Sequence, residues 1–208
     1  MPARYVAIEG PMGVGKTSLS LLLAAQTGAR AVLEPAGNPF VFASRQGGSA
    51  FQSQLFQLLS RYQQKDALSQ EDLFARGGIV SDFLFNCDRI VAASQLGRDE
   101  LALYDKVYGL LGRNQPRPDL VVYLQARPEV LLERVRKRAP GMVLGRDFVQ
   151  KVAQAYAEYF FHYGEGPLLV VNTSEIDFVE RRSDLDELVA VIQKTRAGIS
   201  HYSPLGSR

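Results

Sequence analysis

The chain has 208 residues, of which 46% are hydrophobic and 22% are charged, with a net charge of +2. These values predict one globular domain, or one domain with an appended lid. A single cysteine, Cys87, excludes a disulfide framework, and two histidines argue against a histidine-built metal centre. The near balance of 24 basic and 22 acidic residues gives no support for nucleic-acid binding.

No apolar run is long enough to cross a membrane. The lone thiol and a first segment without a signal-peptide layout lead us to expect a cytoplasmic protein.

Short apolar runs alternate with longer amphipathic stretches along the chain. We expect strands at residues 5–8, 31–33, 79–80, 120–124 and 168–171. We expect helices at residues 16–26, 49–65, 99–111, 128–138, 148–163 and 184–195. This alternation predicts an α/β fold, a five-stranded parallel sheet with helices on both faces. The domain should span residues 1–196, and residues 197–208 should form a flexible tail.

One segment after the first expected strand carries a phosphate-binding pattern. It fits G-x-x-x-x-G-K-[ST] and leads into the first expected helix, as such a loop requires. Its amides and the helix N-terminus attract phosphate oxygens, while Lys16 can reach the β- and γ-phosphates and Thr17 can ligate Mg²⁺. The alternative is a glycine-rich turn without a ligand. The predicted nucleotide-binding residues of this segment are Gly10, Pro11, Met12, Gly13, Val14, Gly15, Lys16, Thr17 and Ser18.

Two carboxylates follow the second and third expected strands, at the edge of a parallel sheet where ligands bind. Glu34 could accept the proton of an attacking hydroxyl as a general base, or it could be a solvated loop residue before a turn proline. Asp82 could hold Mg²⁺, directly or through water, or it could cap the apolar stretch that follows it.

A recognition surface for a flat heterocycle is suggested by Gln54 and Arg61. They lie seven residues apart and so share one helix face. An amide and a guanidinium together can read the donor and acceptor edges of such a ring. Nearby aromatic residues could form stacking walls, although burial in the core is the favoured reading for them. These aromatic residues are Phe40, Phe42, Phe51 and Phe85.

The densest basic cluster runs from Arg134 to Arg138, at the end of an expected helix. Arginines on such a segment can clamp a transferring phosphoryl group and neutralise its charge. The alternative is a cationic helix end that complements the helix dipole. Beside a phosphate loop we favour a short arginine-rich lid, at about residues 134–147.

Taken in order, these motifs resemble the deoxynucleoside kinase family, most closely its bacterial deoxyadenosine and deoxyguanosine kinase branch. The resemblance covers roughly Arg4 to Leu188. It rests on the order and spacing of several loose motifs, of which none is specific alone. They are Ile8-Glu9-Gly10, Glu34-Pro35, Val80-Ser81-Asp82-Phe83-Leu84-Phe85, Asp88-Arg89-Ile90, Pro118-Asp119-Leu120, Phe160-Phe161-His162-Tyr163 and Asn172-Thr173.

The resemblance implies a P-loop kinase fold, ATP and Mg²⁺ as cofactors, and a homodimer. It also implies transfer of phosphate from ATP to the 5′-hydroxyl of a deoxynucleoside, with a purine favoured. Glu34 matches the general base, and Gln54 and Arg61 match the residues that read the nucleobase. Arg134 and Arg138 match lid arginines that act in catalysis with Lys16. The expected substrate site further includes Asp82 and Phe85, and Asp177 and Phe178 resemble the loop that borders the adenine of ATP.

This chain departs from the family pattern in several places. Where many members carry Glu-Arg-Ser after the third strand, it has Ser81-Asp82-Phe83, so Arg76 or Arg89 would have to replace the base-steadying arginine. The segment 41–50 is shorter and lacks the tyrosine that contacts the sugar 3′-hydroxyl. The lid lacks a second arginine and a glutamate for the same atom. We therefore hypothesise altered sugar recognition.

Two other functions stay open: a kinase of another nucleoside-like or nucleotide substrate, and an ATP-binding regulator with weak turnover.

Overall fold

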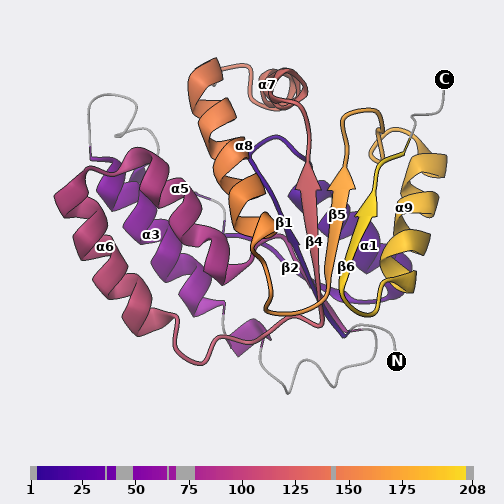
Figure 1. The fold of residues 1–208 in the computed structure, drawn as a ribbon, viewed down its shortest axis with the longest axis horizontal. Coiled ribbons are helices and arrows are strands. Elements are labelled where there is room, and N and C mark those ends of the chain that lie inside the picture. Colours follow the sequence, from indigo (N-terminus) through magenta and orange to yellow (C-terminus); the bar gives the residue numbers. More distant parts are fainter. Residues whose placement is uncertain are drawn as a thin grey trace.

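The computed structural model describes residues 4–35, 37–40, 49–64, 66–68, 78–141 and 144–204. Its centre is a six-stranded, all-parallel sheet in the order β2-β3-β1-β4-β5-β6 (Figure 1). The strands are β1 Tyr5–Glu9, β2 Arg30–Val32, β3 Ile79–Ser81, β4 Leu120–Gln125, β5 Leu168–Asn172 and β6 Ile199–Tyr202. The predicted α/β class and parallel sheet are confirmed.

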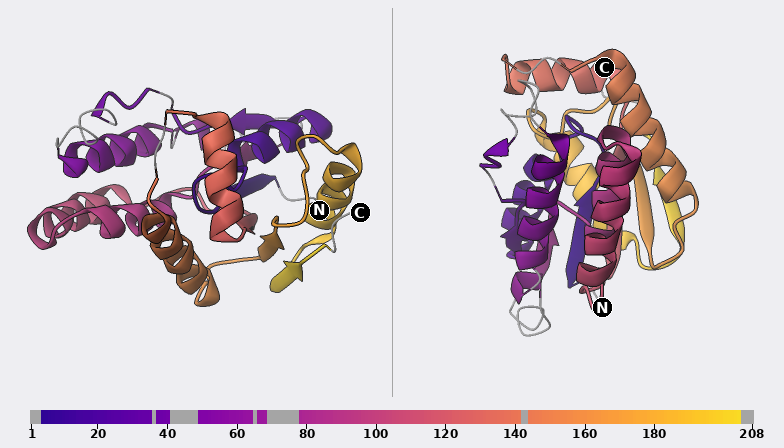
Figure 2. Two further views of the ribbon diagram at one scale, coloured as in Figure 1. Left: turned by 90° about the horizontal axis from the view of Figure 1, so that it is seen from above. Right: turned by 90° about the vertical axis from the view of Figure 1, so that its left-hand side faces the viewer.

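Helices cover both faces of the sheet and one of them crosses its carboxyl edge (Figures 1 and 2). They are α1 Lys16–Thr27, α3 Ala50–Gln63, α5 Asp88–Gln95, α6 Arg98–Leu111, α7 Pro128–Arg138, α8 Arg146–Phe161 and α9 Arg182–Lys194. Two 3₁₀ turns lie at Asp66–Leu68 and Phe85–Cys87. Within the described residues, no helix is long and apolar enough to cross a membrane.

The helix ends follow the local chemistry of the sequence. Ser49 caps α3 by accepting a hydrogen bond from the Phe51 amide at 3.2 Å, as serine commonly does at this position. Gly28 ends α1 in the left-handed conformation, which glycine adopts without steric cost. Pro128 opens α7, where its missing N–H costs no hydrogen bond.

Two elements differ from the sequence-based expectation. Helix α5 was not predicted, because its eight residues are too short for a clear helical period. Strand β6 lies within residues 197–208, so Ile199–Tyr202 is an ordered strand where a flexible tail was predicted, and the sheet has six strands instead of five. Its main chain pairs with β5, from Leu168 opposite Ile199 to Val171 opposite Tyr202. None of its side chains is fully buried, so a short edge strand gives no hydrophobic signal.

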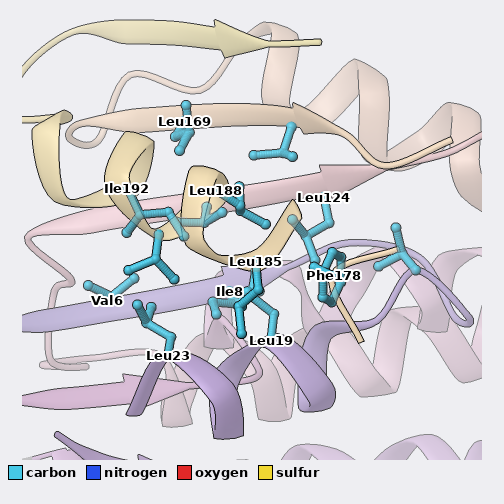
Figure 3. Packing of buried hydrophobic residues seen from close by; sticks show 14 of the residues in the cluster. Val6, Ile8, Leu19, Leu23, Leu124, Leu169, Phe178, Leu185, Leu188 and Ile192 are labelled. Carbon is cyan, nitrogen blue, oxygen red and sulfur yellow. The ribbon is translucent and has the colours of Figure 1, made fainter. Parts of the chain in front are cut away.

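The core has a separate cluster on each face of β1, because successive side chains of a strand point to opposite faces. Val6 and Ile8 pack with residues of α1 and α9, including Leu19 and Leu188 (Figure 3). Tyr5 and Ala7 face the other side, toward the aromatic side chains of α8. A third, smaller cluster joins α3, α5 and α6. This packing fixes the carboxyl ends of β1 and β3 between α1 and the α3–α5 layer.

Candidate active site

The predicted phosphate loop lies between β1 and α1, in the context that its pattern requires. The ammonium group of Lys16 donates a hydrogen bond to the Gly10 carbonyl oxygen at 2.7 Å, so it lies across the loop. Gly10 and Gly15 have φ angles of 148° and 104°, a region that favours glycine. A β-carbon on Gly10 would lie 2.2 Å from the Leu124 carbonyl oxygen, and one on Gly15 would lie 2.7 Å from the Phe178 ring. The loop is thus confined between the end of β4 and Phe178.

The segment expected to border adenine lies beside this loop. Phe178 is buried in the core cluster that contains α1, and its ring covers Gly15. Asp177 is exposed, and its carboxylate accepts hydrogen bonds from the amides of Val179 and Glu180, each at 3.1 Å. Phe178 therefore contacts the phosphate loop, while the Asp177 side chain stabilises the turn before α9.

Asp82 connects the phosphate loop to the segment that follows β2, through hydrogen bonds to Thr17 and Glu34. It is 3% exposed, and its Oδ2 accepts a hydrogen bond from the Thr17 hydroxyl at 2.6 Å. Its Oδ1 accepts a hydrogen bond from the Glu34 amide at 2.6 Å. The sequence predicted that Thr17 and Asp82 share a metal site, and the structure brings their oxygen atoms together. This donor set fits Mg²⁺, which prefers oxygen ligands and takes few of them from a protein beside phosphates. The described residues contain no cluster of three or more His, Cys, Asp or Glu side chains that could hold a metal ion.

The Glu34 side chain is held by α3. Its Oε1 accepts hydrogen bonds from Arg61 Nη2 at 3.0 Å and Nε at 3.2 Å, and a further one from the Gln57 amide. The side chain is 26% exposed, so solvent or a substrate can still reach the carboxylate. The candidate general base and the candidate base-reading arginine are therefore in direct contact.

Arg61 also pairs with a carboxylate that the sequence analysis did not assign to the site. Its Nη1 lies 2.7 Å from Asp88 Oδ1, and the two side chains are 6% and 2% exposed. Burial raises the pKa of Asp88 and the charge of Arg61 opposes this effect, while the nearby carboxylates raise the pKa of Arg61. Tyr104 donates a further hydrogen bond to Asp88. In the sequence, Asp88 is an aspartate that begins a helix after an apolar stretch. This was the one feature that could have pointed to it as a site residue, but such an aspartate usually only caps the helix.

The other predicted recognition residues, Gln54 and Phe85, are both buried and have partners within the protein. Gln54 is buried and donates a hydrogen bond to Gln95 at 3.0 Å. Phe85 stacks on Tyr108 with ring centroids 5.4 Å apart, which agrees with the core interpretation. It is Phe83 whose ring lies 5.7 Å from the Arg61 guanidinium carbon. An aromatic ring from the loop after β3 therefore lies beside the Arg61 guanidinium group.

The lid arginines occupy different environments. Arg134 donates to the Thr173 hydroxyl at 3.0 Å, to the Thr173 carbonyl at 2.8 Å and to the Ile176 carbonyl at 3.0 Å. It therefore joins α7 to the loop after β5, and phosphate contact by Arg134 stays a prediction. Arg138 is exposed at the end of α7.

Of the two proposed substitutes for the base-steadying arginine, the structure describes only Arg89. Arg89 pairs with Asp105 at 2.6 Å on the exposed surface of α5 and α6. Arg76, the segment 41–48 with Phe42, and lid residues 142–143 lie outside the described residues. Among the described residues, Arg61 and Gln57 hold the Glu34 carboxylate.

The buried ion pair makes a specific prediction about stability. We expect Arg61→Leu to lower the free energy of unfolding by about 3–5 kcal/mol, because it leaves the Asp88 carboxylate buried without its charge partner. Urea denaturation followed by circular dichroism measures this loss. Arg89→Leu removes an exposed ion pair and should cost at most about 1 kcal/mol. Equal losses in the two variants would contradict the prediction.

Comparisons with known proteins concern the family and the fold of this chain. A family model described as deoxynucleoside kinase matches residues 6–196. Deoxyguanosine kinase of Bacillus subtilis is 29% identical over 207 residues, covering 92% of this chain and 97% of that protein. Deoxyadenosine kinase of Lactobacillus acidophilus is 23% identical over 212 residues, covering 92% and 95%. The solved structure of deoxyadenosine kinase from M. mycoides with bound dATP aligns with a TM-score of 0.75 at 20% identity, covering 91% and 98%. The last similarity supports the fold alone.

Proposed function

Since the chain belongs to the deoxynucleoside kinase family, we propose that it transfers the γ-phosphoryl group of ATP to the 5′-hydroxyl of a purine deoxynucleoside. Glu34 accepts the proton of the 5′-hydroxyl group. At the same time the 5′-oxygen of the deoxynucleoside forms a bond to the γ-phosphorus. The bond from that phosphorus to the β–γ bridging oxygen breaks, and ADP leaves. The purine preference is supported by relatives named as deoxyguanosine and deoxyadenosine kinases.

The observation that carries this proposal is the pair of hydrogen bonds on Asp82. One carboxylate contacts Thr17 of the phosphate loop and the main chain of Glu34, each at 2.6 Å. The phosphate loop and the main chain of Glu34 are thereby joined through one carboxylate, which supports the proposal because positioning supplies much of the catalysis in phosphoryl transfer. Thr17 and Asp82 would hold Mg²⁺, which neutralises phosphate charge when bound.

The side chains that would recognise the nucleoside come from α3 and α5. Arg61 and Gln54 present donors from α3, and Asp88 presents a carboxylate from α5. A base with both acceptor and donor edges fits such a set. Arg134 and Arg138 would approach the phosphates from α7, for which Arg134 would have to leave its contacts on Thr173 and Ile176. We also propose a cytoplasmic location, on the basis of the single buried cysteine.

A coupled assay with ATP and Mg²⁺ tests the reaction directly. The panel contains the four deoxynucleosides, their ribose and 3′-deoxy counterparts, and the corresponding monophosphates. We expect a purine deoxynucleoside to give the highest kcat/KM. A preference for a monophosphate would replace this proposal with a nucleotide kinase. ATP binding without turnover on any acceptor would favour the regulator.

The 3′-deoxy compounds in this panel test the altered sugar recognition. Losing buried polar partners for the 3′-hydroxyl removes about 1–3 kcal/mol of binding if nothing replaces them. We therefore expect the 3′-deoxy analogue to retain kcat/KM within about threefold of its parent, since little is then left to lose. A loss of a hundredfold or more would show that the hydroxyl is still recognised.

A homodimer through α3 and α6 is the assembly that we propose. These helices lie side by side at one end of the molecule (Figures 1 and 2). Three large apolar side chains on them are exposed: Leu59 by 42%, Leu103 by 51% and Leu110 by 67%. We expect sedimentation equilibrium to give a dimer that Leu110→Glu converts to a monomer. Leu21→Glu, at a 49% exposed position on α1, should leave the dimer intact. A monomeric wild-type protein at micromolar concentration would contradict this assembly.

A further inference from the structure

A fully buried carboxylate lies at the end of β1, and the mechanism above gives it no role. Glu9 is 0% exposed and continues the face of β1 that carries Tyr5 and Ala7. It accepts hydrogen bonds from the Gly10 amide at 3.0 Å, the Leu84 amide at 2.7 Å and the Tyr156 hydroxyl at 3.2 Å. A carboxylate only accepts hydrogen bonds, and these three donors, none of which is a cation, satisfy it.

The first of these bonds holds the amide of the glycine whose carbonyl oxygen contacts Lys16. The Gly10 amide donates to Glu9, and the Gly10 carbonyl oxygen accepts from Lys16 Nζ at 2.7 Å. Glu9 therefore holds the amide end of this glycine, and Lys16 contacts its carbonyl end. The backbone of Gly10 passes so close to β4 that no side chain fits, because a β-carbon there would lie 2.2 Å from the Leu124 carbonyl oxygen.

The other two bonds reach the acceptor side and the helix after the lid. Leu84 follows Asp82 by two residues, so its amide bond holds the loop that carries this candidate metal ligand. Tyr156 belongs to α8 and is itself buried. One carboxylate thus joins three segments that are distant in sequence: the phosphate loop, the loop after β3, and α8.

Two positive charges lie near Glu9, Lys16 from the phosphate loop side and Arg61 from α3. Burial raises the pKa of Glu9, and the positive charges of Lys16 and Arg61 act in the opposite direction, together with the hydrogen bonds from Gly10 and Leu84. A buried carboxylate is costly to a fold unless it is fully hydrogen-bonded, and here three donors offset that cost. The two main-chain donors belong to the segments that carry Lys16 and Asp82, so the carboxylate holds these two segments in position.

We propose that Glu9 is a positioning residue, which holds the Gly10 peptide and the Leu84 main chain in the arrangement that phosphoryl transfer needs. The proposal rests on the proposed kinase function, because its effect is expressed through Lys16 and Asp82. It does not require Glu9 to touch a substrate or to exchange a proton.

Two variants separate positioning from stability. In Glu9→Gln, an NH₂ group replaces one acceptor oxygen, so either the Gly10 or the Leu84 amide loses its acceptor. Tyr156→Phe removes only the bond to α8 and keeps both main-chain bonds. Each variant loses one buried hydrogen bond, so similar decreases in Tm are expected. Only Glu9→Gln disturbs the segments that carry Lys16 and Asp82.

The measurements are kcat at saturating substrates, ATP affinity by displacement of a fluorescent ATP analogue, and Tm. We expect Glu9→Gln to lower kcat by about tenfold or more and to weaken ATP binding by about threefold or more, with Tyr156→Phe within about twofold of wild type. Equal effects of the two variants, or wild-type values for Glu9→Gln, would overturn the proposal. If Glu9→Gln does not fold, Glu9→Asp keeps the charge but is too short to reach all three donors, and the same criteria apply.

The same experiment distinguishes this inference from the proposed function. A wild-type protein that phosphorylates no nucleoside would refute the proposed function. The ratio of ATP affinities between Glu9→Gln and Tyr156→Phe would still decide the role of Glu9. Active wild type with unimpaired Glu9→Gln would refute only the positioning role.

Discussion

We expect Glu34→Gln to lower kcat by about 10²- to 10⁴-fold, the range typical of losing a general base. The glutamine side chain keeps the size and one acceptor oxygen for Arg61, but it cannot take the proton of the 5′-hydroxyl. ATP affinity should change little, because the contact of Glu34 with the donor side runs through its main-chain amide on Asp82. Steady-state kinetics and ATP titration measure the two quantities on the same preparation.

The control for this prediction is Glu158→Gln, the same chemical change at an exposed position of α8. It should leave kcat and ATP affinity unchanged. If Glu34→Gln retains kcat within about threefold of wild type, Glu34 is not the general base. The deprotonation would then have to be assigned to another group near the hydroxyl.

We expect Lys16→Ala to impair both binding and turnover. Its ammonium group lies on the Gly10 carbonyl at 2.7 Å, from where it can move to the β- and γ-phosphates. Losing one charged donor to a transferring group costs about 10²- to 10³-fold in kcat, and the affinity for ATP should fall at the same time. This joint loss distinguishes Lys16 from Glu34, whose replacement affects turnover alone.

Lys194→Ala is the matched control, because Lys194 is exposed in the last turn of α9. Titration of both variants with ATP, followed by kinetics at saturating ATP, separates the binding and turnover effects. An unchanged ATP affinity in Lys16→Ala would mean that the triphosphate does not bind on the loop between β1 and α1. The proposed arrangement of donor and acceptor would then be wrong.

Much of the fold and the donor site follows from local patterns. Apolar runs and helical spacing predicted β1 to β5 and most helices, because each pattern lies within a few consecutive residues. The phosphate loop was predicted for the same reason, since its glycines, Lys16 and Thr17 are contiguous. The proximity of Thr17 and Asp82 was also predicted, because parallel strands bring their carboxyl ends to one edge.

The tertiary structure decided the contacts between distant segments. Arg61 pairs with Asp88 from another helix, and Glu9 meets Tyr156, 147 residues away. These contacts depend on how α3, α5 and α8 pack on the sheet, which no local pattern encodes. Strand β6 belongs to the same class, because only main-chain pairing with β5 makes Ile199–Tyr202 a strand. The sequence by itself determined the fold class, the phosphate loop and the family. Packing determined which buried charges meet, because the free energy of an ion pair depends on distance and burial, and folding sets both.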